Sequence, residues 1–123
     1  MDNKNKICLN SRDELYRFDI SNVVYFEADG NYTNIILSNN LKAVVCMNLM
    51  HMQNLIKDIL TNKRAEIFCR VGKRYIINIS YVFQINILNQ KLVLSDGDRF
   101  VFYLDISKEA LKNLRRLFIE ERK

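Results

Sequence analysis

Three cationic side chains and a glycine lie between two apolar runs near the middle of this chain, in the segment FCRVGKRYIIN at 68–78. Glycine adopts a left-handed backbone conformation that other residues resist, so Gly72 predicts a turn. That turn would place Lys73 and Arg74 at an exposed tip, with Arg70 at its base. A basic tip on a β framework can contact the phosphates and base edges of nucleic acid. It can equally be a solvated loop that keeps a strand edge from pairing, and the segment alone favours neither interpretation.

A second polar cluster follows an Asp-Gly turn signal at 29–30. Its members Tyr32, Thr33 and Asn34 carry hydroxyl and amide groups that can hydrogen bond to base edges or phosphates. The alternative is a turn that is stabilised by its own side chains.

The sequence does not contain the residue sets of common catalytic or metal sites. Its single histidine, His51, lies in a predicted helix, and its three cysteines form no Cys-x-x-Cys pair. Glu27 and Asp29 would share a strand face, but no second acidic pair completes a constellation. We therefore expect no enzymatic activity, no metal and no cofactor. Cys69 adjoins Arg70, which gives a further hypothesis of a lowered thiol pKa and redox sensitivity.

Composition and charge are those of one globular domain. The 123 residues are 49% hydrophobic and 27% charged, with no proline and three glycines. We expect a frayed terminus at 1–6 and a single domain at 7–123. The net charge of +5 favours polyanionic partners. No apolar run reaches the roughly 18 residues of a membrane span, and we see no signal peptide, so a cytoplasmic protein without a membrane partner is expected.

The hydrophobic pattern predicts a mostly β fold with one internal helix and one terminal helix. The helix at 49–60 has apolar residues at helical spacing and Asn48 as its N-cap, and a C-terminal helix is expected at about 107–121. The other face of that terminal helix is basic, with Lys108, Lys112, Arg115 and Arg116. Strands are expected at 7–9, 15–18, 23–26, 32–37, 41–47, 82–88, 91–95 and 99–104, and on both sides of Gly72.

Three segments together resemble the LytTR DNA-binding domain of bacterial response regulators. Residues 20–33, ISNVVYFEADGNYT, are similar to a family pattern of the Ile-x-Tyr-Ile-Glu-Ala-x-Gly-Asn-Tyr type. The helix at 48–60 matches one that the family introduces with Thr-Leu or Ser-Leu. Residues 68–78 are similar to Phe-x-Arg-Val-His-Arg-Ser-Tyr-Ile-Val-Asn, with Gly72 at the histidine and Lys73-Arg74 at Arg-Ser. The resemblance runs from about Ile7 to Leu114.

The resemblance implies an elongated antiparallel β core of about ten strands, and a transcriptional regulator that binds double-stranded DNA. Its loops would enter successive major grooves of a direct-repeat site, with two copies side by side on the DNA. The implied DNA contacts are Tyr32, Thr33, Asn34, Arg70, Lys73 and Arg74. The family usually carries a receiver or sensor domain as well, which is the implied upstream partner.

The third contact of the family comes from a Pro-Val-Ser-Arg-type segment after the last strand. We match this place to 101–105, VFYLD, where there is no arginine and Asp105 would repel phosphate. This difference motivates an alternative function, in which the same fold is a protein-interaction module that no longer reads DNA specifically.

Overall fold

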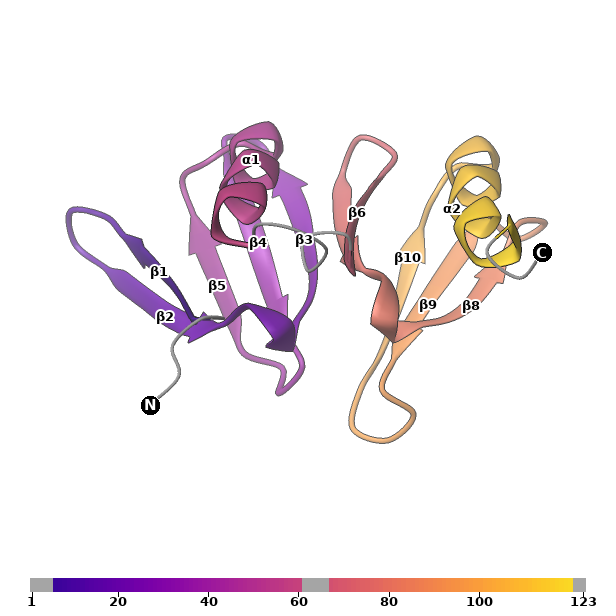
Figure 1. Ribbon diagram of the computed structural model, residues 1–123, viewed down its shortest axis with the longest axis horizontal. Coiled ribbons are helices and arrows are strands. Elements are labelled where there is room, and N and C mark those ends of the chain that lie inside the picture. Colours follow the sequence, from indigo (N-terminus) through magenta and orange to yellow (C-terminus); the bar gives the residue numbers. More distant parts are fainter. Residues whose placement is uncertain (1–5, 61–66, 121–123) are drawn as a thin grey trace.

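The computed structural model describes residues 6–60 and 67–120, which form ten strands in three antiparallel sheets and two α-helices (Figure 1). The strands are β1 (Lys6–Asn10), β2 (Leu15–Asp19), β3 (Val23–Asp29), β4 (Tyr32–Leu37), β5 (Lys42–Val45), β6 (Phe68–Val71), β7 (Tyr75–Asn78), β8 (Val82–Asn86), β9 (Lys91–Ser95) and β10 (Val101–Asp105). The helices are α1 (Leu49–Ile59) and α2 (Lys108–Glu120), and two 3-10 turns are η1 (Ile20–Asn22) and η3 (Ile79–Tyr81). The prediction of a mostly β fold with two helices is confirmed.

The predicted ends of the domain are only partly described. The expected frayed segment was 1–6; residues 1–5 lie outside the described residues, whereas Lys6 is the first residue of β1. The last residue of the expected C-terminal helix, residue 121, also lies outside the described part.

A five-stranded sheet in the order β5-β4-β3-β7-β6 occupies the middle of the molecule. The β1–β2 hairpin and α1 lie on one side of it, and the three-stranded sheet β10-β9-β8 lies on the other, with α2 beside it (Figure 1). Gly30 and Gly72 both have positive φ, of 61° and 64°, at the β3–β4 and β6–β7 turns. A side chain would strain these turns, because only glycine adopts this conformation at no steric cost.

The first core lies between the central sheet and α1. Phe26, Ile35 and Ile76 of the sheet are fully buried there, against Met52 and Ile56 of α1. These helix residues are four apart, so they form the apolar stripe that the sequence pattern predicts. The expected N-cap of α1 is confirmed, since Asn48 accepts a hydrogen bond from the His51 amide at 2.8 Å.

The second core lies on the opposite face of the same sheet. Val24 and Ile77 pack there with Leu92 and Leu94 of β9 and Leu111 of α2. The central sheet is therefore a middle layer covered on both faces. This explains why β3 begins with four consecutive buried residues instead of the alternation typical of a sheet with one solvated face.

A buried asparagine connects β7 to the beginning of β3. The Asn78 side chain donates to the Val23 carbonyl at 2.9 Å and accepts from the Ser80 amide at 3.0 Å, while its exposed fraction is 1%. Asp19 begins η1 in the same way, accepting from the Ser21 amide at 3.0 Å. Each residue thus directs the chain through one 3-10 turn into the next strand.

Replacing Asn78 with alanine is expected to lower the free energy of unfolding by about 1–3 kcal/mol, because buried polar groups lose their partners. Urea denaturation followed by circular dichroism measures this change. Asn54→Ala is the matched control, because Asn54 is exposed on α1. Equal midpoints for the two variants would contradict a structural role for Asn78.

Candidate nucleic-acid interface

The two polar clusters that the sequence singled out lie at the same end of the central sheet. Across the β3–β4 turn Asp29 faces Tyr32, and on the other side of β3 Glu27 faces Tyr75. The Ala28 amide also donates to the Arg74 carbonyl at 2.8 Å. The β3–β4 and β6–β7 turns are therefore neighbours, although more than 40 residues separate them in the sequence. We call this end of the sheet the turn edge; it comprises residues 29–32 and 72–74.

The β6–β7 turn is exposed and is held in place by its own arginine. Arg70 donates through Nη2 to the Lys73 carbonyl at 3.0 Å and through Nη1 to Oε1 of Gln53 on α1 at 3.3 Å. These bonds fix the turn against the helix. Among the residues that the structure describes, the Lys73 ammonium group has no partner, so it is available to an anion.

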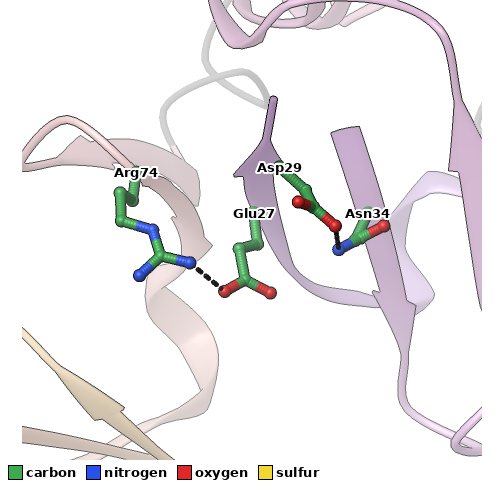
Figure 2. A network of polar contacts seen from close by, with 4 residues as sticks. All are labelled: Glu27, Asp29, Asn34 and Arg74. Atoms are coloured by element: carbon green, nitrogen blue, oxygen red, sulfur yellow. Dashed lines mark hydrogen bonds and ion pairs between the residues drawn. The ribbon is translucent and has the colours of Figure 1, made fainter. Parts of the chain in front are cut away.

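Arg74 is paired within the protein. Its Nη2 lies 2.8 Å from Oε2 of Glu27 (Figure 2). Its guanidinium carbon also lies 5.6 Å from the centre of the Tyr75 ring, within the range of a cation–π contact. The Arg74 side chain nevertheless remains 64% exposed, while that of Glu27 is 24% exposed. Arg74 is thus oriented by the protein and still accessible from solvent.

The β3–β4 cluster divides into one exposed and two buried side chains. Tyr32 is 48% exposed, whereas Thr33 and Asn34 are 0% and 6% exposed. The Thr33 hydroxyl donates to the Met47 carbonyl at 2.6 Å, and Nδ2 of Asn34 donates to Oδ2 of Asp29 at 3.4 Å (Figure 2). Direct DNA contact by these residues stays a prediction; in this structure Thr33 and Asn34 stabilise the strand that presents Tyr32.

Three carboxylates near the turn edge have partners within the protein. Glu27 pairs with Arg74, and Asp29 accepts from Asn34. Asp105, which the sequence analysis expected to repel phosphate, forms an ion pair with Lys91. Because ion pairs offset the charges of Glu27 and Asp105, these two carboxylates oppose the approach of a polyanion less than free ones would.

The sequence analysis placed Lys108 on the basic face of the C-terminal helix but did not predict its position beside the turn edge. A Cβ atom placed on Gly72 would lie 3.8 Å from Cβ of Ala110, so the β6–β7 turn lies against the first turn of α2. Lys108 is exposed in that helical turn, after Ser107, whose hydroxyl accepts from the Ala110 amide at 3.3 Å. β10 ends at Asp105, so Ile106, Ser107 and Lys108 follow the last strand. Ser107 caps the helix near the position where the sequence predicted it to begin, but no local signal placed that helix beside the β6–β7 turn.

The redox hypothesis for Cys69 is not supported. The thiol is half-buried, and burial raises its pKa instead of lowering it. A raised pKa means a smaller thiolate fraction and a less reactive cysteine.

Two tyrosines behind the turn edge are buried beside Glu27. Burial, with a further contribution from the Glu27 charge, raises the pKa of Tyr25 to about 12, and the same causes raise the pKa of Tyr75. Both hydroxyls therefore remain protonated at neutral pH. The Tyr25 ring also contacts Phe102 edge-on, with 5.5 Å between ring centres.

The raised Tyr25 pKa predicts a loss of stability in alkali. Tyr25 ionises near pH 10 in the unfolded chain and near pH 12 in the folded protein. Its contribution to the free energy of unfolding is therefore complete below about pH 10 and is lost as the pH rises towards 12. Urea midpoints measured across this range should fall less steeply for Tyr25→Phe than for the wild type. Parallel curves for the two proteins would contradict the assignment.

Exposed cations on the turns of a rigid sheet are typical of a nucleic-acid-binding domain that uses strands and loops. A sequence model of the LytTr DNA-binding domain family matches residues 13–119, and the chain belongs to this family. The family is a DNA-binding one and not a family of enzymes. The match to its sequence model confirms the resemblance seen in the sequence. A comparison with curated proteins gave no match.

The fold is similar to that of a solved LytTr DNA-binding domain, from a protein described as a methyl-accepting/DNA response regulator of Bacillus cereus. The two chains are 19% identical with a TM-score of 0.64, and the similarity covers 93% of this chain and 96% of the other. At this identity the likeness establishes the fold.

Neither helix in 6–60 and 67–120 is long and apolar enough to cross a membrane. Within the same ranges, no three His, Cys, Asp or Glu side chains are grouped so that they could hold a metal ion.

Proposed function

We propose that this chain is the DNA-binding part of a bacterial transcriptional regulator and that it reads a specific duplex site with its turn edge. The observation that carries the proposal is the convergence of two exposed turns, from distant parts of the sequence, at one end of a rigid sheet. The exposed side chains there include Tyr32, Lys73 and Arg74, and Lys108 adjoins them on α2.

The chemistry of these side chains suits a DNA groove. Lys73 supplies a mobile positive charge for phosphate, and Arg74 supplies the planar donor pair that fits the guanine edge. Lys108, exposed in the first turn of α2, supplies a third cation beside these turns. It would contact DNA beside the β6–β7 turn. Arg70 acts mainly by fixing this turn, through its bond to the Lys73 carbonyl.

The family resemblance extends the proposal to the arrangement on DNA. Two copies would bind direct repeats, each with its turns in successive major grooves, and a receiver or sensor domain would control them. Such a protein would act in the cytoplasm of a bacterium, where the DNA is.

Selection from a pool of random duplexes, followed by sequencing, tests this function. We expect an enriched direct repeat with half-sites about one helical turn apart. Fluorescence anisotropy across a salt series then separates specific binding from the electrostatic contribution. Weak binding that depends steeply on salt, with no enriched sequence, would contradict specific reading.

A second candidate function is supported by the outer face of the three-stranded sheet. Phe83 of β8 and Tyr103 of β10 are 71% and 67% exposed there, with Val101 exposed beside Tyr103. Large exposed apolar side chains commonly mark protein contacts. The same fold could therefore serve as a protein-interaction module, and the absence of any sequence enrichment in the selection would favour this function.

A further inference from the structure

Arg74 and Lys73 are adjacent and both exposed, but the protein treats them differently. Arg74 has one Nη group engaged by Glu27 at 2.8 Å and its guanidinium carbon 5.6 Å from the Tyr75 ring centre. Lys73 has no side-chain partner among the residues that the structure describes. One cation of the turn is thus oriented, and the other is free to rotate.

Glu27 is itself rigidly placed. It lies on β3, the middle strand of the central sheet, and its neighbours across the sheet are Asn34 on one side and Tyr75 on the other. Arg74 approaches from the adjoining turn, whose carbonyl is bonded to the Ala28 amide at 2.8 Å. Figure 2 shows the Arg74 side chain reaching from its turn towards the Glu27 carboxylate on β3.

The pairing with Glu27 changes which DNA group suits Arg74. A guanidinium has five N–H donors, so engagement of one Nη leaves enough for a two-bond contact with guanine. The carboxylate also fixes the side chain before binding, which reduces the entropy lost on contact. At the same time it offsets much of the positive charge, and a phosphate is attracted mainly by charge. Lys73, uncompensated and flexible, has the opposite properties.

We propose that Glu27 is a positioning residue that makes Arg74 the base-reading cation of the turn, with guanine as its target, and leaves phosphate contact to Lys73. This inference rests on the proposed function. It goes beyond the family resemblance, because the family pattern has serine where this chain has Arg74.

The test measures a specificity ratio for each variant. This ratio is the dissociation constant for a random duplex divided by that for the DNA sequence that the wild-type chain selects. Glu27→Gln should lower this specificity ratio by about tenfold or more, because one two-bond base contact is lost or misdirected. Its binding to random DNA should not weaken, since a negative charge has been removed. Arg74→Lys keeps the charge and should lower the ratio similarly. When the selection is repeated with Glu27→Gln or Arg74→Lys, the preference for one guanine should be lost. Lys73→Ala should weaken binding to the selected duplex and to the random duplex by the same factor.

Two controls separate positioning from other effects of Glu27→Gln. Asp98→Asn changes the net charge by the same amount, but in the β9–β10 turn. Because this turn lies at the opposite end of the three-stranded sheet from Lys91 and Asp105, the substitution should leave the specificity ratio unchanged. In an Arg74→Ala background, Glu27→Gln should have no further effect on the ratio, because Glu27 acts through Arg74. Thermal melting confirms that each variant is folded.

The outcomes distinguish this inference from the proposed function. An unchanged ratio in folded Glu27→Gln, or the same loss in the Arg74→Ala background, would overturn the positioning role while leaving specific DNA binding intact. Wild-type binding that selects no sequence would overturn base reading by Arg74. A wild-type chain that binds no duplex would contradict the proposed function, and the inference with it.

Discussion

Replacing Lys73 and Arg74 together with alanine is expected to weaken binding to the selected duplex by about 2–4 kcal/mol, which is a loss of roughly 30- to 1,000-fold. Lys73→Ala would remove the proposed phosphate contact, and Arg74→Ala would remove the guanidinium group that Glu27 holds at the turn edge. The dependence of log K on log salt should also become shallower, by about one unit for the free cation and by less for the paired one. Fluorescence anisotropy at several salt concentrations measures both effects.

The control for this pair removes two charges elsewhere. Lys42 begins β5, next to the β4–β5 turn and away from the turn edge, and Lys57 is near the end of α1; both are exposed. Alanine at these two positions should weaken binding only slightly, because neither side chain belongs to the turn edge. An equal loss in both double variants would show that the chain responds to net charge and not to this turn.

Replacing Phe26 with alanine is expected to lower the free energy of unfolding by about 3–5 kcal/mol, the largest effect on stability that we predict. Phe26 lies on β3 with no exposed surface, and its ring contacts Phe68 edge-on with 5.7 Å between centres. The truncation would leave a cavity between the central sheet and α1. Chemical denaturation measures the loss, and Phe26→Leu should cost less because it refills part of the space.

Phe83→Ala provides the matched control, because it removes the same ring from an exposed position. Its effect on stability should be within about 1 kcal/mol. If Phe26→Ala were equally mild, the central sheet would not be the packed middle layer described above. The Phe26 variant should also weaken DNA binding, since β3 carries Glu27 and forms half of the β3–β4 turn.

The sequence predicted the elements well because their signals are local. Glycines at 30 and 72 indicated turns, and both have positive φ. The spacing of apolar residues at 49–60 predicted α1, and Asn48 correctly marked its beginning. The run of apolar residues in β9 left burial on both faces open, and Leu92, Val93 and Leu94 are all buried.

The sequence predicted the site less completely because the roles of its side chains depend on distant partners. Thr33 and Asn34 are polar residues beside a turn, which is typical of exposed groups, yet pairing with β5 and Asp29 buries them. Arg70 is fixed by Gln53, which lies 17 positions earlier. The Glu27–Arg74 pair joins residues 47 positions apart. Without the order of strands in the sheet, no pattern in the sequence brings these groups together.

DNA reading by the turn edge is tested most directly by an NMR titration of the labelled chain with its selected duplex, in which amide and side-chain shifts report the contact surface. We predict the largest changes in the β3–β4 turn, the β6–β7 turn and the first turn of α2, with Tyr32, Lys73 and Lys108 among them. The face that carries Phe83 and Tyr103 should remain almost unchanged. Changes centred on that face, with the turn edge unaffected, would contradict DNA reading by the turn edge.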